Sequence, residues 1–186
     1  MIAVYLFILL VIVQRFVELL IANRNAKWIK SQGGYEAGKE HYKYIVGLHV
    51  LFFVSLLIEV TVTKHTFMLW SIFPLGVFLL AQLGRVWALS SLGRFWNTRI
   101  MILPGAKVIA KGPYRYLRHP NYAIVIAEIA CLPLIFQAYW TAIVFTILNA
   151  VTLSTRIQVE ERALEEATNY HKTFEKRKRF IPTYDK

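Results

Sequence analysis

Apolar residues come in long runs along this chain, and short polar stretches separate the runs. The first run covers residues 1–22, in which Gln14, Arg15 and Glu18 interrupt an otherwise apolar sequence. About 20 apolar residues at helical rise cross a bilayer, so this run predicts a membrane-spanning helix. The later runs predict four more membrane helices, at about 44–63, 66–89, 122–137 and 139–155.

A few polar side chains fall inside these apolar runs. Arg15 and Glu18 are three residues apart on one helical face, which favours a structural pair pointing into the bundle, with a substrate contact as the alternative. Arg85 lies near the end of its run, so we expect it to extend to the membrane interface. His49 is interpreted as an interior histidine, and for Glu59 a structural role and a substrate contact both remain open.

Composition supports a membrane protein of one domain, residues 1–186. With 56% hydrophobic residues in 186, the chain is too apolar for a soluble fold of this size. The first apolar run begins at Met1 without a basic segment before it, so we expect it to be retained and not cleaved as a signal. The single Cys131 excludes an internal disulfide, and no His/Cys cluster has metal-ligand spacing, so no metal site is predicted.

The net charge of +11 is distributed unevenly over the polar segments. Of the 22 Lys and Arg residues, 19 fall in segments 23–43, 90–121 and 156–186, whereas Lys64 lies between the second and third runs. The positive-inside rule then places the amino terminus outside and the carboxyl tail in the cytosol. No nucleic-acid-binding motif accompanies the charge, so we expect anionic lipid as its partner, including at the basic tail 176–179.

A compact polar and aromatic stretch, residues 112–122, precedes the fourth apolar run. Pro113 and Pro120 lack backbone donors and disfavour helical geometry at the residue before each, so the segment between them holds a turn or two at most. Its arginines, tyrosines and His119 lie where the unpaired N–H groups of the next helix begin. The stretch is either a basic turn on the membrane surface or a site for a ligand with a carboxylate or ribose hydroxyls.

The fifth run is predicted to continue as a cytosolic helix over 156–173. At 100° per residue, Arg156 and Glu160 share an apolar, inward face with Leu164, whereas Glu161 and Arg162 take the opposite face. A charged pair on an inward face is either a structural bridge between residues i and i+4 or part of a site.

Two motifs, in this order, resemble those of one family of membrane enzymes. They are Arg118-His119-Pro120-Asn121-Tyr122 and the later Arg156-Ile157-Gln158-Val159-Glu160-Glu161. The chain thereby resembles the isoprenylcysteine carboxyl methyltransferase family over about residues 85–175. Its first third, with Gln14-Arg15, Trp28 and His41-Tyr42, is similar to a bacterial branch of that family.

The resemblance implies an all-α, polytopic membrane fold in a bacterial plasma membrane, with about five spanning helices and a cytosolic cofactor site. It implies S-adenosylmethionine as cofactor and O-methylation of the carboxylate or acidic hydroxyl of a lipophilic acceptor. The acceptor is either prenylcysteine-like or an alkylpyrone-like polyketide. An acceptor of this acidity is ionised near neutral pH, so no strong general base is required.

The resemblance also implies roles for particular residues. Arg156 corresponds to the residue that orients the acceptor carboxylate, and Glu160 to an acidic cofactor contact, which makes these two the candidate catalytic residues. Further cofactor-binding positions implied by the match are Arg99, Ala106, Lys107, Val108, Ile109, Tyr114, His119, Pro120, Asn121 and Tyr122. One departure is Ile124, which stands where the family usually has glycine.

Two other functions are weighed against the methyltransferase. Membrane sterol reductases share a similar carboxyl-terminal region and use NADPH, but they are usually much longer chains. A non-enzymatic lipid-binding protein is the third hypothesis, in which Arg156 and Glu160 form only a structural bridge. The sequence leaves the oligomeric state open.

Overall fold

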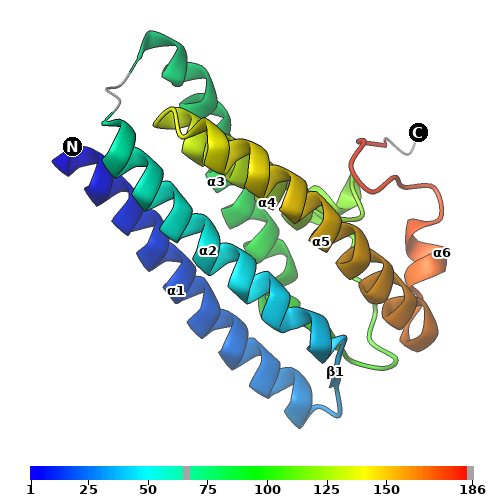
Figure 1. Cartoon of the computed structure of the whole chain (residues 1–186). Helices are drawn as coiled ribbons and strands as arrows, with labels where there is room; N and C mark the ends of the chain where they lie inside the picture. Colours follow the sequence, from blue (N-terminus) through cyan, green and yellow to red (C-terminus); the bar gives the residue numbers. More distant parts are fainter. Residues whose placement is uncertain (65–67, 184–186) are drawn as a thin grey trace.

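The structure is a computed structural model, and it describes residues 1–64 and 68–183. The chain is mostly helical (Figure 1). Its helices are α1 (Ile2–Ser31), α2 (Lys39–Thr63), α3 (Ile72–Leu92), α4 (Pro120–Ile135), α5 (Tyr139–Ala167) and α6 (Tyr170–Phe174). Three short 3-10 turns, η1 (Leu69–Ser71), η2 (Gly93–Phe95) and η3 (Gly112–Arg115), and two strands, β1 (Tyr35–Ala37) and β2 (Ile100–Ile102), complete the described elements.

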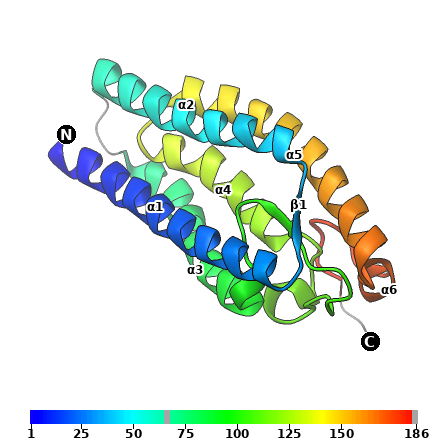
Figure 2. The same cartoon turned by 90° about the horizontal axis from the view of Figure 1, so that it is seen from below.

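Helices α1 to α5 lie side by side in one elongated bundle, with the amino terminus at one end and α6 at the other (Figures 1 and 2). Apolar side chains from all five meet in the interior, among them Ile8, Phe52, Phe78, Leu132 and Phe145. Large apolar residues also cover the outside of the bundle. Leu20, Phe73 and Ile147 are each at least 60% exposed, which suits a surface that faces lipid.

Four of the described helical segments are long and apolar enough to cross a membrane: α1, α2, the segment Leu69–Phe95 and α5. Helix α4 is equally apolar but has 16 residues, or about 24 Å at helical rise. The chain is therefore an all-α, polytopic integral membrane protein, as predicted, with α4 as a shorter fifth helix. The predicted start of the third helix, residue 66, lies outside the described residues.

Helix α1 continues nine residues beyond its predicted end at residue 22, to Ser31. Ala22, Asn25, Ala26 and Ile29 are buried and recur at helical spacing, so tertiary packing extends the helix through a polar sequence. The Asn25 amide donates to the carbonyl oxygen of Trp96 at 2.7 Å, which fixes this extension against the segment after α3. The predicted polar loop is correspondingly shorter.

Strands β1 and β2 form a two-stranded antiparallel sheet, which was not predicted from the sequence. Tyr35 pairs with Ile102, and Ala37 pairs with Ile100. The sheet joins the turn between α1 and α2 to the segment that follows α3. It therefore holds the end of the bundle where the polar motifs lie.

Helix α5 is unbroken from Tyr139 to Ala167, so the fifth apolar run and the first part of the predicted cytosolic helix are one element. The Glu59 carboxylate of α2 accepts hydrogen bonds from the backbone N–H of Thr141 at 2.8 Å and of Trp140 at 3.0 Å. Glu59 thus satisfies orphan donors at the start of α5. This contact gives Glu59 a structural role.

The predicted helix 156–173 is interrupted at Thr168 and Asn169 before α6 begins. The carbonyl oxygen of Ala167 accepts from the backbone N–H of Gly105 at 3.0 Å. The Asn169 side-chain oxygen accepts from the N–H of Val108 at 3.2 Å. The Ala167 carbonyl and the Asn169 side chain thus bind the segment 105–108, and the chain turns at this point.

Gly112, at the start of η3, has a positive φ of 58°. A Cβ at this position would lie 2.0 Å from Ser91 Oγ and 3.1 Å from Trp87 Nε1, both on α3. Only glycine accommodates this conformation and this close approach together. Gly112 therefore lets the polar stretch 112–122 pack directly against α3.

Candidate active site

One cavity of about 690 Å³ runs from the polar motifs into the apolar interior of the bundle. Its membrane part is lined by apolar residues of α1, α2 and α4, such as Val11, Phe53 and Leu132. Its other end is lined by nearly all the predicted site residues: Arg99, Ala106, Lys107, Val108, Ile109, Tyr114, His119, Asn121, Tyr122, Arg156 and Glu160. Pro120 is not among the lining residues; it is buried at the first position of α4.

Arg156 and Glu160 are connected through the phenol of Tyr122. The Arg156 Nε donates to Tyr122 Oη at 2.7 Å, and Tyr122 Oη donates a short hydrogen bond to Glu160 Oε2. Arg156 Nη2 donates to the carbonyl oxygen of Thr98 at 2.6 Å. The described residues provide no partner for Arg156 Nη1, so a buried guanidinium on the cavity wall keeps donors for an anionic group.

His119 and Tyr170 form a second polar group on the cavity wall. His119 Nε2 lies 3.0 Å from Glu161 Oε1 and 3.3 Å from Tyr170 Oη. Burial, followed by the Glu161 carboxylate, raises the pKa of the Tyr170 phenol well above its usual range. A phenol is already protonated at neutral pH, and this shift keeps Tyr170 protonated in alkaline solution as well.

Glu161 is buried, although the helical pattern placed it on the polar face of its helix. Besides His119, it contacts Arg179, whose Nη2 lies 2.5 Å from Glu161 Oε2. The carboxyl-terminal segment returns along this side of α5 and covers it, so both faces of α5 are in contact with protein here. A helical projection cannot show a covering segment that is remote in sequence.

Two residues of the polar stretch 112–122 each carry an atom that has no hydrogen-bond partner among the described residues: Tyr114 Oη and Asn121 Oδ1. Both atoms are buried and both residues line the cavity. Burial, and next the Glu160 carboxylate, raise the pKa of the Tyr114 phenol above its usual range, while Arg85 opposes the shift. A buried polar group without a partner costs free energy, so these atoms fit a ligand that carries hydroxyl or amino groups.

Trp96 is a cavity-lining residue that the sequence reading missed. It is 2% exposed, and its Nε1 donor also lacks a partner among the described residues. Nothing local distinguishes it from the other tryptophans, because its burial depends on contacts between α1 and the segment after α3.

Arg99 and the segment 106–109 also line the cavity. Arg99 stacks over the Tyr42 ring, with its guanidinium 4.6 Å from the ring centroid, and its Nη1 lies 3.3 Å from Glu36 Oε2. These contacts tie Arg99 to β1 and α2. The segment 106–109 has no regular secondary structure and follows strand β2.

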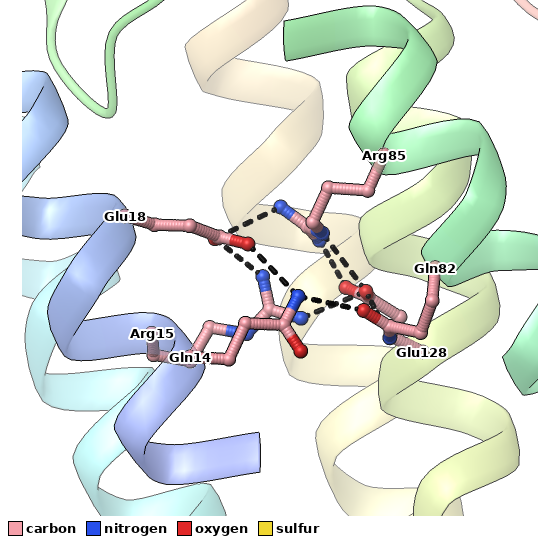
Figure 3. Close-up of polar contacts among 6 residues, drawn as sticks. All are labelled: Gln14, Arg15, Glu18, Gln82, Arg85 and Glu128. Carbon is pink, nitrogen blue, oxygen red and sulfur yellow. Dashed lines mark hydrogen bonds and ion pairs between the residues drawn. The ribbon is translucent and has the colours of Figure 1, made fainter. Parts of the chain in front are cut away.

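A network of charged and amide groups lies between the membrane helices (Figure 3), and its four charged side chains line the cavity. Its members are Gln14, Arg15, Glu18, Gln82, Arg85 and Glu128. Arg15 lies 2.6 Å from Glu18 and 2.7 Å from Glu128, and Arg85 Nε donates to Glu128 Oε1 at 2.9 Å. The network joins α1, α3 and α4, which gives Arg15 and Glu18 the structural contacts expected of them.

Arg85 does not extend to the interface as predicted. It is 4% exposed and lies seven residues before the end of α3, or about 10 Å inside the helix. Glu18 and Glu128 compensate its charge at that depth. Arg85 therefore pairs with acidic residues inside the bundle and does not extend to the interface.

Glu128 was missed because a single acid in an apolar run gives a weak pattern. The signal was present in the charge balance, since two arginines in the apolar runs were left with one nearby acid, Glu18. Intramembrane charges usually pair inside the bundle. His49 lies on the same cavity wall, where its Nδ1 donates to the Ile45 carbonyl oxygen at 2.8 Å.

The carboxyl-terminal segment is more than the lipid-facing patch predicted from its charge. The backbone N–H of Arg118 donates to the Lys178 carbonyl at 3.1 Å, and that of His119 donates to the Arg179 carbonyl at 3.3 Å. Lys176 and Lys178 are exposed. The segment thus serves two purposes: part of it packs on the polar motif, and its lysines face outward.

The fold and the cavity define a class: a small polytopic membrane protein with a polar cavity at one end of its helical bundle that opens into an apolar interior. The family model of the isoprenylcysteine carboxyl methyltransferase (ICMT) family matches residues 71–166. The chain belongs to this family, which places it among membrane methyltransferases. The match confirms the resemblance read from the two motifs.

Two bacterial relatives cover most of the chain. A Bacillus subtilis (strain 168) protein named "Uncharacterized protein YpbQ" is 46% identical over 162 residues, which are 87% of this chain and 96% of that protein. An "Uncharacterized protein" of Haemophilus influenzae is 30% identical over 151 residues, 81% of this chain and 88% of the relative. The similarity thus extends into the amino-terminal helices, beyond the family model, as expected for a bacterial branch.

Proposed function

We propose that this protein is an S-adenosylmethionine-dependent O-methyltransferase that methylates the carboxylate or acidic hydroxyl of a lipophilic acceptor. The observation that carries the proposal is a continuous cavity that joins Arg156, Tyr122 and Glu160 to the apolar interior of the bundle. A prenylcysteine-like or alkylpyrone-like acceptor has the required form, with an acidic head group for Arg156 and an apolar tail for the membrane part of the cavity.

The residues at the cytosolic end fit the cofactor. When bound, S-adenosylmethionine supplies an electrophilic methyl group. Tyr114 and Asn121 would hold it through Tyr114 Oη and Asn121 Oδ1, which have no partner among the described residues, and the Glu160 carboxylate would face its positive charge. His119 and Tyr170 complete this wall of the cavity.

The chain itself would contribute binding, alignment and exclusion of water. Arg156 is positioned by Tyr122 and Thr98, so its guanidinium would hold the acceptor oxygen without reorientation. Aligning two reactants in this way can lower a barrier by up to about 7–11 kcal/mol. Because the acceptor is already ionised at neutral pH, no residue has to remove a proton.

Replacing His119 with alanine is expected to abolish micromolar binding of S-adenosylhomocysteine while the protein remains folded. The variant removes a buried ring from the cavity wall and leaves Glu161 bound to Arg179. Isothermal titration calorimetry of the purified protein measures the affinity, and His171→Ala, an exposed histidine, is the matched control. Unchanged affinity in His119→Ala would remove this residue from the site, and binding of NADPH in place of S-adenosylhomocysteine would favour the reductase.

We also propose that the protein lies in the bacterial plasma membrane with its amino terminus outside. In a Cys131→Ser background, a membrane-impermeant thiol reagent added to intact cells is expected to label Trp140→Cys and not Lys107→Cys. Both positions are exposed, and they lie at opposite ends of the bundle, at the start of α5 and in the segment after β2. Labelling of Lys107→Cys alone would show the opposite orientation, with the amino terminus inside.

A further inference from the structure

The carboxyl-terminal segment after α6 doubles back on the polar motif that precedes α4. Besides the two backbone hydrogen bonds to Arg118 and His119, the Thr183 N–H donates to the Tyr116 carbonyl oxygen at 3.1 Å. These bonds use backbone groups that must otherwise find water or another partner. They set the position of Arg179 relative to His119.

The Arg179 side chain contacts both oxygens of the Glu161 carboxylate. Its Nε lies 3.1 Å from Glu161 Oε1, and its Nη2 lies 2.5 Å from Glu161 Oε2. The same Oε1 accepts the hydrogen bond of His119 Nε2 at 3.0 Å. Two-point contact between a guanidinium and a carboxylate fixes geometry as well as charge, so Arg179 fixes the group that orients His119.

We propose that Arg179 is a positioning residue for the methyl-donor site, acting through Glu161 to fix the ring of His119 in the cavity wall. This inference rests on the proposed function and adds a residue from outside both motifs. Arg118 Nη1 lies 3.8 Å from Glu161 Oε1 and competes for the same carboxylate. Without Arg179, Glu161 is free to turn toward Arg118, and the His119 Nε2 loses its fixed acceptor.

The alternative role of Arg179, attraction to anionic lipid, predicts a different dependence on the side chain. A lipid surface attracts any nearby cation about equally, whereas the bidentate contact requires a planar guanidinium. Lys176 lies in the same basic segment and is exposed, so it provides the matched loss of one positive charge.

Affinity for S-adenosylhomocysteine, measured by calorimetry in detergent without anionic lipid, tests the proposal. Arg179→Ala is expected to weaken binding about tenfold, since it removes the charged partner that orients a ligand-contacting group. Arg179→Lys is expected to recover part of the loss, and Lys176→Ala to stay within about twofold of the parent. The KM for the acceptor should not change. Equal affinity in Arg179→Ala and Lys176→Ala would overturn the proposal.

A double-mutant cycle separates positioning from general weakening of the fold. If Arg179 acts through Glu161, Arg179→Ala should have little further effect on affinity in a Glu161→Gln background. Losses that simply add would show that the two residues act independently and would refute the proposal. Thermal unfolding of each variant, with Arg179→Lys as the conservative change, reports any loss of folded protein.

A readout without ligand keeps this inference distinct from the proposed function. In ¹⁵N-histidine-labelled protein, the ring nitrogens of His119, assigned by their absence in His119→Ala, should shift in Arg179→Ala and not in Lys176→Ala. Unshifted resonances would overturn the positioning role. Shifted resonances in a protein that does not bind S-adenosylhomocysteine would instead support the positioning of His119 and contradict the methyltransferase assignment.

Discussion

Replacing Arg156 with alanine is expected to reduce kcat/KM for methyl transfer by about a hundredfold or more. A charge-assisted hydrogen bond contributes about 1.5–3 kcal/mol, or about ten- to a hundredfold for each bond removed. Arg156→Lys should retain some activity, because an ammonium group keeps the charge but cannot contact Tyr122 Oη, the Thr98 carbonyl and an acceptor oxygen in one plane. Transfer of labelled methyl to a lipophilic acid is the measurement.

Two controls make the Arg156 result specific to the acceptor. The affinity for S-adenosylhomocysteine should stay within a few-fold in Arg156→Ala, whereas Glu160→Ala should weaken it. Arg162→Ala removes the same residue type from the same helix. Because Arg162 is exposed and forms an exposed pair with Glu166, the activity of this variant should match that of the parent. Full activity in folded Arg156→Ala and Glu160→Ala would show that the two residues form only a structural bridge.

The second large effect is expected on stability. Glu128→Ala removes the carboxylate that Arg15 and Arg85 share inside the bundle. Breaking a buried ion pair on one side typically costs about 3–5 kcal/mol, because a charge is left without its partner. We therefore expect a strongly lowered free energy of unfolding in detergent. Glu166→Ala, which breaks an exposed pair, should cost about 1 kcal/mol or less.

A charge-balanced double variant tests whether the unpaired charge causes this loss. Glu128→Met with Arg85→Met removes one acid and one base and leaves Arg15 paired with Glu18 at 2.6 Å. Buried pairs can often be replaced by apolar residues with little cost, so the double variant should be more stable than Glu128→Ala. A double variant as unstable as the single one would indicate that the hydrogen-bond geometry, and not the charge, stabilises the bundle.

The two motifs could be read from the sequence because their residues are close together along the chain. Helical spacing alone placed Arg156 on an inward face, and the structure buries it in the cavity wall. Its connection to Tyr122 and Glu160 required the packing of α4 against α5. Helical spacing placed Glu161 on the polar, outward face, although Glu161 is buried. The segment that covers it begins after α6 and is distant along the chain.

The sequence by itself determined the membrane class, the family, and the approximate position of each long helix, because hydrophobicity and helical periodicity are local properties of the chain. Tertiary structure alone decided the extension of α1 to Ser31, the pairing of Arg85 with Glu128, and the return of Arg179 to Glu161. Each of these depends on a partner that is distant along the chain. A buried charge or a polar helix end without a partner costs free energy. Only the folded bundle brings the partner into contact with it.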